Sequence, residues 1–474
     1  MRIKNHPILQ FEEKKTITFT FDGKPIQAQQ GDSIAAALHD AGIKVLSHSP
    51  RLNRPRGFFC AIGKCSSCMM QVDGIPNVKT CMVMAEPGME VKTQTGWGTL
   101  SHQQPRAEYP RRNIPTLETE IAIIGAGPAG LSAAVAASGF GAKVMIFEEN
   151  SKIGGQLIKQ THMFFGSKEH YAKTRGIDIG KKLVDQLSDN VAIFTQTPVI
   201  GCYPPHQLAV IKDNRLYMVK AKKIIVAGGA AEKMLSFPDN DLPGIYGAGA
   251  VQTLMNVYGI MPGKRVLMVG AGNIGVIVAY QLLQAGVDVA CVVEALSTIG
   301  AYQVHASKLR RCGVPILTRH SIKQPLGKDY VEGATIVQLN DNWKPIKGSE
   351  RDIEVDTICL SVGLNPSTEI FSQIGCKMKN IPELGGEVAV RNYDMETTVK
   401  GIYVAGDAAS IEEASSAMLE GKLAGLDAVD KLKGSSDDIQ KAKKTVRKSL
   451  KELREGPFGE NIRKGEKKMF KEAD

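Results

Sequence analysis

Four closely spaced cysteines constrain the fold of this chain more than any other feature. Cys60, Cys65 and Cys68 follow the spacing C-x4-C-x2-C, and Cys81 lies thirteen residues further on. This is the plant-type spacing for a [2Fe–2S] cluster. Each iron takes two thiolates, so a tight loop must supply three sulfur atoms and a neighbouring strand the fourth. The sequence therefore predicts a cluster that passes one electron at a time, with these four cysteines as its ligands.

Around this loop, residues 1–96 predict a small β-rich domain of the ferredoxin-like, β-grasp type. Alternating side chains predict a strand over Thr16–Phe21, and a polar cap followed by apolar residues predicts a helix over Ser33–Ala41. Two further strands are expected at Met69–Val72 and Asn77–Cys81. The fourth sulfur would then lie on a strand beside the loop.

From Glu120 onward strands alternate with helices, which indicates βαβ units and a parallel sheet. The first unit runs from a strand into Gly125, Gly127 and Gly130. These glycines are expected to allow a tight turn, the approach of the backbone to a pyrophosphate, and close packing of helix on strand. Glu148 ends the second strand, 18 residues after the last glycine, where an acid would bond the ribose hydroxyls of a dinucleotide.

A second unit repeats this pattern with Gly270, Gly272 and Gly275. A strand over Asp288–Val293 ends at Glu294, 19 residues after the last of these glycines. A carboxylate at that position favours a free 2′-hydroxyl and repels a 2′-phosphate, and no arginine follows closely, so we expect NAD rather than NADP. The alternative is a site that stays empty or holds another adenine nucleotide.

A third segment indicates which dinucleotide the first unit holds. Thr397–Asp407 has the pattern of a strand that ends in a Gly-Asp turn at Gly406 and Asp407. It resembles the second FAD fingerprint of the two-dinucleotide-domain flavoproteins, the broad class that contains glutathione and thioredoxin reductases. The resemblance implies that Asp407 bonds the ribityl chain of FAD, and that Gly155 and Gln156 belong to the segment beside the flavin.

The order of these motifs predicts an α/β chain in which an FAD-binding domain is split by an inserted nucleotide-binding domain. An amphipathic helix is expected at Asp437–Arg454, and the residues after it could be disordered. The predicted parts are a ferredoxin-like domain (1–96), a linker (97–119), the first part of the FAD domain (120–245), an NAD(P)-type domain (246–350), the second part of the FAD domain (351–433) and a basic C-terminal helix or tail (434–474).

Charge and hydropathy exclude several classes of function. The formal net charge is +10, but few aromatic residues interleave with the lysines of the tail, so no nucleic-acid partner is expected. Ile121–Ala142 and Val266–Val287 are each 22 residues without a charge, yet both run from a short strand into a glycine fingerprint. We interpret them as buried strand-turn-helix units and expect no transmembrane segment. The N-terminus lacks a signal-peptide pattern and five cysteines are scattered singly, which indicates a cytoplasmic protein.

No group of residues forms a recognisable catalytic constellation, and we predict no catalytic side chain. No CxxC pair occurs from residue 120 onward, which argues against the reduction of disulfides. The nine histidines are dispersed, and only His162 lies close to the segment assigned beside the flavin.

Fusion of the cluster domain to this flavoprotein resembles the alpha subunits of bacterial and archaeal amine-oxidising complexes. These complexes are heterotetrameric sarcosine oxidase, dye-linked proline or hydroxyproline dehydrogenase, opine oxidase and hydrogen cyanide synthase. The resemblance is carried by PRGFFCAIGKCSSCMMQVDG, by FPDNDLPGIYGAGAVQTLMN at 237–256 and by SVGLNPS at 361–367. It implies FAD, a [2Fe–2S] cluster and often a second nucleotide. It also implies a hetero-oligomer with a flavin-containing oxidase-like beta subunit, in some relatives a small Fe–S subunit, and an external electron acceptor.

The main hypothesis is therefore an electron-transfer subunit of an amino- or imino-acid dehydrogenase complex. A second hypothesis is a self-sufficient NADH:acceptor oxidoreductase, in which the second fingerprint delivers hydride to FAD and the cluster receives single electrons. A third is a non-enzymatic scaffold that binds nucleotides for assembly alone. The substrate, the partner chains and the direction of electron flow stay open.

Overall fold

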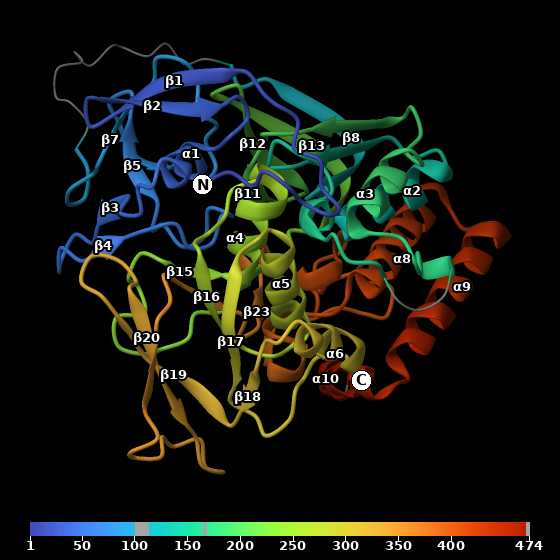
Figure 1. Ribbon diagram of the computed structural model, residues 1–474. Coiled ribbons are helices and arrows are strands. Elements are labelled where there is room, and N and C mark those ends of the chain that lie inside the picture. Colours follow the sequence, from blue (N-terminus) through green and yellow to red (C-terminus); the bar gives the residue numbers. More distant parts are fainter. Residues whose placement is uncertain (100–112, 165–167, 471–474) are drawn as a thin grey trace. The chain divides into compact units, whose positions relative to one another are not determined.

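The computed structural model describes residues 1–99, 113–164 and 168–470 (Figure 1). The chain forms two compact units, each built from two segments. Unit 1 combines Met1–Glu108 with Glu232–Gly363, and unit 2 combines Tyr109–Ala231 with Leu364–Asp474. Of the linker expected at 97–119, residues 100–112 lie outside the described part of the chain. The two units are described separately below.

The N-terminal half of unit 1 is a five-stranded sheet with the strand order β2-β1-β7-β5-β6 and one short helix. The pairing of β1 with β2 is antiparallel and that of β1 with β7 is parallel. Strands β1 and β5 have the predicted bounds, and Ser33 caps the predicted helix by accepting from the Ala36 N–H. The elements are β1 (Thr16–Phe21), β2 (Lys24–Gln29), α1 (Ile34–Asp40), β3 (Ser47–His48), β4 (Pro55–Arg56), β5 (Met69–Val72), β6 (Ile75–Lys79) and β7 (Glu90–Lys92).

The other half of unit 1 is a nucleotide-binding fold with the parallel strand order β15-β22-β16-β17-β18. A three-stranded antiparallel sheet, β19-β20-β21, is attached to it. The elements are β15 (Ile245–Gly247), α4 (Ala248–Gln252), η3 (Thr253–Val257), β16 (Arg265–Val269), α5 (Asn273–Gln284), β17 (Asp288–Glu294), α6 (Gln303–Arg311), β18 (Ile316–Thr318), β19 (His320–Leu326), β20 (Gly333–Gln338), β21 (Arg351–Ile353) and β22 (Thr357–Leu360).

The chain passes from unit 2 into unit 1 at residues 231–232 and back into unit 2 at residues 363–364. The sequence had placed the domain boundaries at 245/246 and 350/351. Strand β22 explains the second difference, because it pairs with β15 and β16 inside the nucleotide-binding sheet. The strands at the two crossings, β14 (Ala230–Glu232) and β23 (Leu364–Pro366), pair with each other.

The core of unit 2 is a mixed sheet with the strand order β10-β9-β8-β13-β12-β11, to which β26 adds beside β13. Strands β8, β9, β10, β13 and β26 are parallel, as the alternation of strands and helices predicted. The elements are β8 (Thr116–Ile124), α2 (Pro128–Gly139), β9 (Val144–Phe147), η1 (Gly155–Lys159), η2 (Lys168–His170), α3 (Gly176–Val184), β10 (Val191–Phe194), β11 (Val199–Tyr203), β12 (Gln207–Lys212), β13 (Arg215–Val226), α7 (Glu369–Gln373), β24 (Met378–Ile381), η4 (Pro382–Leu384), β25 (Gly386–Ala389), β26 (Ile402–Val404) and η5 (Gly406–Ala408).

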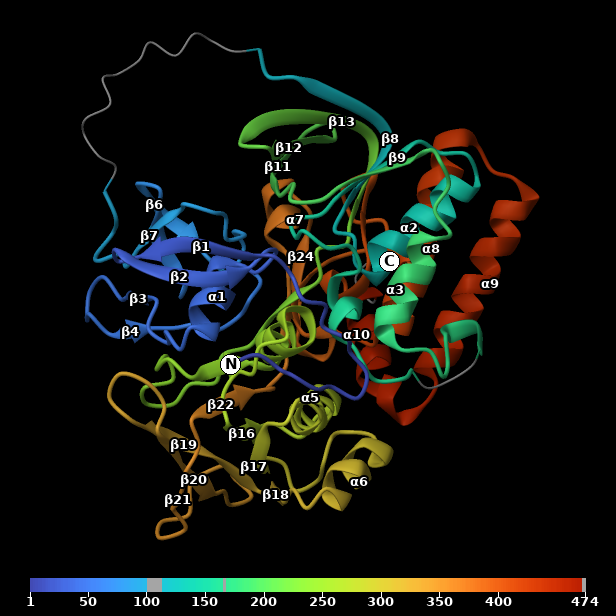
Figure 2. The same ribbon diagram turned by 45° about the horizontal axis from the view of Figure 1, so that its top comes forward.

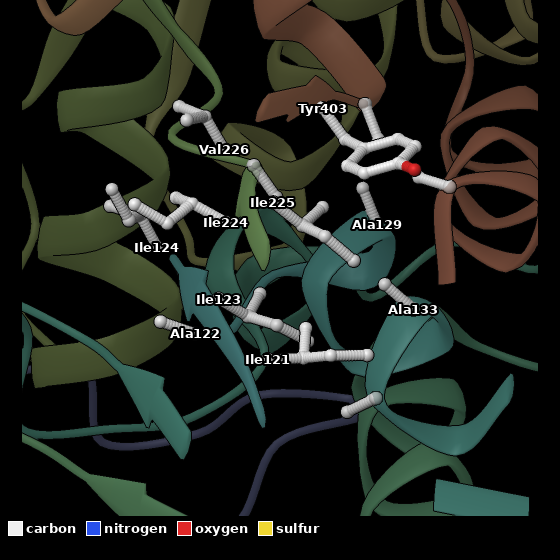
Figure 3. Close-up of a cluster of buried hydrophobic side chains, with 14 of the residues drawn as sticks. Ile121, Ala122, Ile123, Ile124, Ala129, Ala133, Ile224, Ile225, Val226 and Tyr403 are labelled. Carbon is white, nitrogen blue, oxygen red and sulfur yellow. The ribbon is translucent and has the colours of Figure 1, made fainter. Parts of the chain in front are cut away.

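Helix α2 packs on this sheet through small side chains. Figure 3 shows Ala129 and Ala133 of α2 facing Ile121 and Ile123 of β8, with the ring of Tyr403 close by. The unbroken apolar run of β8 is thus buried in the core of the unit, as expected for a central parallel strand. No helix within the described residues is long and apolar enough to cross a membrane.

Three helices close the C-terminal side of unit 2: α8 (Ala414–Lys433), α9 (Asp437–Arg454) and α10 (Glu460–Phe470). Figures 1 and 2 show α9 alongside α8, which in turn lies alongside α2. The helix predicted at Asp437–Arg454 is confirmed. The expectation of disorder after it was wrong for α10, because Ile462 and Met469 pack into a small core with Leu384.

Candidate functional site

The four cysteines predicted to bind the cluster meet at one end of the ferredoxin-like fold. Cys60, Cys65 and Cys68 lie in the loop between β4 and β5, and Cys81 lies in the turn after β6. The thiol of Cys60 hydrogen-bonds to those of Cys65 and Cys81, and the thiol of Cys81 also bonds to that of Cys68. The four thiols therefore meet in one group, as the four ligands of a [2Fe–2S] cluster must.

The backbone of this loop curls three times within a few residues. Ala61, Gly63 and Ser66 all have left-handed φ angles, of 55°, 67° and 60°. Left-handed alanine and serine are uncommon and are often held at functional sites. This conformation turns the loop back on itself, so that its cysteines converge on one place.

Cys81 does not lie on a strand, contrary to our expectation. Strand β6 ends at Lys79, and Thr80 donates both its N–H, at 3.2 Å, and its hydroxyl, at 2.7 Å, to the Cys68 carbonyl. These two bonds hold Cys81 next to Cys68.

The chemistry of the four cysteine side chains shows whether they fit an iron–sulfur cluster. Cys60, Cys65, Cys68 and Cys81 are free thiols, and four thiolates are the ligand set of a plant-type [2Fe–2S] cluster. Hydrogen bonds from Cys65 and Cys81 lower the pKa of the Cys60 thiol, which favours the thiolate that iron binds. The arrangement fits a two-iron cluster.

The first glycine fingerprint in unit 2 forms a nucleotide cradle. Gly125 has a φ of 98°, and a Cβ there would lie 2.5 Å from the Ala227 carbonyl oxygen. A Cβ on Gly130 would lie 1.9 Å from the Gly125 oxygen, whereas one on Gly127 would meet nothing closer than 3.9 Å. The outer two glycines are required by the fold itself. Gly127 instead leaves free space at the N-terminus of α2, where a pyrophosphate would bind.

Glu148 is buried beside this cradle. One carboxylate oxygen accepts from the Ala126 N–H at 2.8 Å, and the other accepts from the Asn150 N–H at 2.9 Å. Gly154 closes the cradle by donating to the Ala126 carbonyl at 2.9 Å, and Gly155 lies directly against Gly127. Gln156 is next to them at the start of η1 and is exposed.

The Gly-Asp turn completes this site. Gly406 has a φ of 69°, and a Cβ on it would lie 2.9 Å from the Cβ of Ala129 on α2. Asp407 follows directly and accepts a long hydrogen bond of 3.4 Å from the Glu412 N–H. Burial raises the pKa of Asp407 to about 7, and the charges of Glu420 and Glu412 add to this effect. A hydroxyl donor from a ligand would stabilise its carboxylate.

The second fingerprint in unit 1 reproduces the first in detail. Glu294 accepts from the Ala271 N–H at 2.7 Å and from the Leu296 N–H at 2.9 Å, as Glu148 does with its own neighbours. A Cβ on Gly270 would clash with the Ser361 carbonyl oxygen at 2.1 Å, and one on Gly275 would clash with the Gly270 oxygen at 2.1 Å, but Gly272 has nothing within 4 Å.

A loop closes the second cradle as Gly154 closes the first, because the Ala301 N–H donates to the Ala271 carbonyl at 3.0 Å. Both cradles therefore offer the same features to a dinucleotide. These are a free approach at the middle glycine, a helix N-terminus and an acid held by two backbone N–H groups.

The structure brings together in unit 2 all the residues that the sequence linked to FAD. Sequence reasoning missed Glu420, Arg391 and Arg454, which form a buried ion network behind the Gly-Asp turn. The sequence signal that could have revealed this network is Glu420, an acid in the otherwise apolar N-terminal half of α8. His162 is half-buried with its ring stacked on Phe164.

Fold and sites together define a flavoprotein of two dinucleotide-binding folds fused to a plant-type ferredoxin domain. Comparison with protein families agrees. Residues 119–421 match the family described as pyridine nucleotide-disulphide oxidoreductase, and residues 14–96 match the 2Fe-2S iron-sulfur cluster binding domain. The chain belongs to the pyridine nucleotide-disulphide oxidoreductase family, whose members bind FAD and a nicotinamide dinucleotide. The cysteines between residues 119 and 421 include no CxxC pair.

Individual relatives extend the match to both parts of the chain. The alpha subunit of sarcosine oxidase from Rhizobium meliloti (strain 1021) is 24% identical over 470 residues, covering 85% of this chain and 45% of that protein. One subunit of the opine oxidase of Agrobacterium tumefaciens (strain Ach5) is 29% identical over 334 residues, covering 66% of each. The crystal structure of L-proline dehydrogenase from P. horikoshii has a TM-score of 0.72 at 23% identity and covers 94% of this chain and 79% of that one. This chain spans less than half the length of its sarcosine oxidase relatives.

Proposed function

We propose that this chain is the electron-transfer subunit of a complex that oxidises an amino or imino acid of the proline, hydroxyproline, sarcosine or opine type. The observation that carries the proposal is the presence of two dinucleotide cradles and a four-thiol loop on one chain whose described residues include no recognisable amine-binding or acid–base constellation. The relatives named above, subunits of sarcosine and opine oxidases, support it.

In this proposal unit 2 holds FAD. The N-terminus of α2 and Gly127 bind the pyrophosphate, Glu148 the ribose, and Asp407 the ribityl chain, with Gly155 and Gln156 beside the flavin. FAD supplies the exchange between two-electron and one-electron steps. The residues of the chain bind and orient it and hold the backbone that surrounds it.

Unit 1 holds the other two groups. The thiolates of Cys60, Cys65, Cys68 and Cys81 bind the cluster. Gly270, Gly272, Gly275 and Glu294 bind NAD or another adenine nucleotide. The amine substrate is oxidised on a flavin-containing partner subunit, with an external acceptor taking the electrons, and the protein works as a hetero-oligomer in the cytoplasm.

Assaying the chain with and without its partner tests the proposal. We expect the purified chain alone to give no dye-coupled turnover with proline, hydroxyproline, sarcosine or opines, and turnover to appear when an oxidase-like partner subunit is co-expressed. Cys65→Ser in the complex should keep FAD but lose the cluster spectrum and the electron transfer. Substantial turnover by the isolated chain would refute the proposal.

The same preparation distinguishes the second hypothesis. If NADH rapidly bleaches the flavin absorbance of the isolated chain and an external acceptor is then reduced, the chain is a self-sufficient NADH:acceptor oxidoreductase. Gly272→Val would abolish that bleaching by filling the free space at the second cradle, and Gly139→Val, at an exposed position with open surroundings and no left-handed φ, is the control.

A further inference from the structure

A buried ion network lies directly behind the Gly406–Asp407 turn. The Gly406 N–H donates to one carboxylate oxygen of Glu420 at 2.9 Å. The other oxygen of Glu420 accepts from Arg454 at 2.6 Å and from Arg391 at 3.3 Å. The side chain of Glu420 is 1% exposed and that of Arg454 is 7% exposed. The backbone of the turn is therefore fixed through one carboxylate to a guanidinium of α9.

Arg454 reaches the turn by a second route. Its Nε donates to Glu412 at 3.0 Å, and its Nη2 also bonds that carboxylate. The N–H of Glu412 is the group that donates to Asp407. The remaining Nη1 donates to Glu466 of α10 at 2.7 Å. One guanidinium thus joins both C-terminal helices to the two residues of the flavin fingerprint.

We propose that α9 and α10 are part of the flavin site, and that Arg454 is a positioning residue that holds the Gly406–Asp407 turn through Glu420 and Glu412 and so sets the affinity for FAD. The proposal rests on the assignment of FAD to unit 2, and it is independent of the amine substrate and of the partner subunit.

The physical reason is the balance of charge in a buried space. Three carboxylates, those of Glu412, Glu420 and Glu466, meet two guanidiniums, and Arg454 contacts all three carboxylates while Arg391 contacts two. The planar fork of an arginine holds its carboxylate partners in a fixed geometry, whereas the ammonium of a lysine is a point charge on a flexible stem. Without Arg454, repulsion among the buried carboxylates would displace the turn, or the carboxylates of Glu412 and Glu420 would take up protons.

The turn has little room to move without affecting the nucleotide cradle. Gly406 is wedged against Ala129 in the first turn of α2, the helix whose N-terminus would take the pyrophosphate. A displacement of Gly406 therefore disturbs the ribityl and the pyrophosphate positions together. This couples a residue of α9 to the cofactor without direct contact.

Lys443 provides a matched control on the same helix. Its ammonium is also buried and pairs with Asp427 at 2.5 Å and Asp430 at 3.1 Å, and with Asp394 at 3.5 Å. None of these partners bonds the Gly-Asp turn in the described residues. Lys443→Met should therefore cost stability in the same way as Arg454→Met, since both leave buried carboxylates without their cation.

The experiment measures FAD affinity rather than turnover. FAD-free full-length protein is titrated with FAD while the fluorescence of the flavin is followed, for the wild type and for Arg454→Met, Arg454→Lys and Lys443→Met. We expect Arg454→Met to raise the Kd for FAD about tenfold or more, in line with loss of a charge-assisted support. The Kd of Arg454→Lys should lie between those of the wild type and Arg454→Met, and Lys443→Met should leave the Kd unchanged.

Visible circular dichroism of bound FAD gives a second readout, because a shifted turn changes the surroundings of the flavin. It should differ from the wild type in Arg454→Met and not in Lys443→Met. Far-ultraviolet circular dichroism reports whether each variant is otherwise folded, and Arg454→Lys keeps the test valid if the methionine variant does not fold.

An unchanged Kd in both Arg454 variants would overturn the proposal. Equal weakening of FAD binding by Arg454→Met and Lys443→Met would do so too, because the effect would then be one of general stability. A wild-type protein that binds no FAD at all would instead contradict the assignment of the cofactor.

Discussion

Gly127 and Gly130 lie three residues apart in the same fingerprint but have different physical roles. A Cβ on Gly130 would overlap the Gly125 oxygen at 1.9 Å, so this glycine is required for α2 to pack on β8 in the free protein. A Cβ on Gly127 would meet nothing closer than 3.9 Å. The space in front of Gly127 serves a ligand and not the fold.

Substitution of these two glycines should therefore separate binding from stability. We expect Gly127→Val to lower FAD occupancy while the thermal midpoint of the FAD-free protein stays close to that of the wild type. Gly130→Val should lower both, because the close approach of helix and strand is lost. Flavin content after purification and calorimetry of the FAD-free forms check this, and a Gly127→Val protein that retains stoichiometric FAD would contradict it.

Asp407 makes the FAD-free protein sensitive to pH. Burial raises the pKa of Asp407 from 3.8 to about 7, so the folded state binds a proton that the unfolded state has already lost. This contribution to stability is fully present below about pH 4 and disappears as the pH rises through about 7. The free energy of unfolding should thus fall over this window more steeply in the wild type than in Asp407→Asn.

Urea unfolding of the FAD-free proteins between about pH 5 and about pH 7.5 measures that difference. FAD adds a second check. If a ribityl hydroxyl donates to Asp407, the carboxylate is favoured and binding releases a proton near neutral pH. Calorimetric titrations in two buffers of different ionisation enthalpy would detect the release, and Asp407→Asn should abolish it.

At the scale of single elements, helix α9 shows what an amphipathic pattern reveals and what it hides. The apolar residues Ile439, Val446, Leu450 and Leu453 recur at helical spacing along it. In the structure the fully buried residues are Ile439, Lys443, Leu450 and Arg454. The apolar stripe gave the bounds of the helix correctly, but two cations share the buried face. A charged residue is normally solvated, so nothing local marks these two as buried.

The same contrast holds for the sites. The cysteine loop, both glycine cradles and their acids were predictable because each is specified by residues close together in the sequence. The Arg454–Glu420–Gly406 connection was not predictable, because it depends on which helices meet in three dimensions. The turn at Cys81 was missed for a related reason. It depends on the bond from the Thr80 hydroxyl to the carbonyl of Cys68, twelve residues earlier in the chain.

Helix α10 offers a direct test of its place in the fold. Ile462 is 6% exposed and packs with Ile381, Leu384 and Val388. Ile462→Ala should lower the free energy of unfolding of the protein by about 2–4 kcal/mol, the usual range for a buried isoleucine. Lys464→Ala, on the exposed face of the same helix, should change it by less than about 1 kcal/mol. Denaturant unfolding compares the two, and equal effects would mean that α10 is frayed.

At the scale of the whole molecule, unit 1 is one body made of two folds. A single hydrophobic core includes Phe19 and Leu38 of the ferredoxin-like fold and Leu254 of the nucleotide-binding fold. The ring of Tyr246 in β15 lies 5.8 Å from that of His39 in α1. On the surface of the unit, Asp241 pairs with Arg54 at 2.5 Å and with Arg56 at 2.6 Å, close to the cluster loop.

The stability of the cluster should therefore depend on residues outside the predicted ferredoxin-like domain. Tyr246 is 1% exposed, and Tyr246→Ala should cost about 3–5 kcal/mol of unfolding free energy. We expect it to accelerate the loss of the cluster on heating, followed by visible absorbance. Val304→Ala, at an exposed position of α6 in the same unit, is the control. Unchanged bleaching kinetics in Tyr246→Ala would show that the two folds melt independently.

Each unit is assembled from two stretches of chain that alternate along the polypeptide, and this orders events on the ribosome. The cysteine loop emerges first, but its neighbour Tyr246 follows only after the opening half of unit 2 has been translated. Arg454, which joins α9 and α10 to the Gly406–Asp407 turn, emerges long after Gly125. We therefore expect nascent chains to retain iron and sulfide only after Tyr246 has emerged, and flavin to be loaded only once synthesis has passed α10.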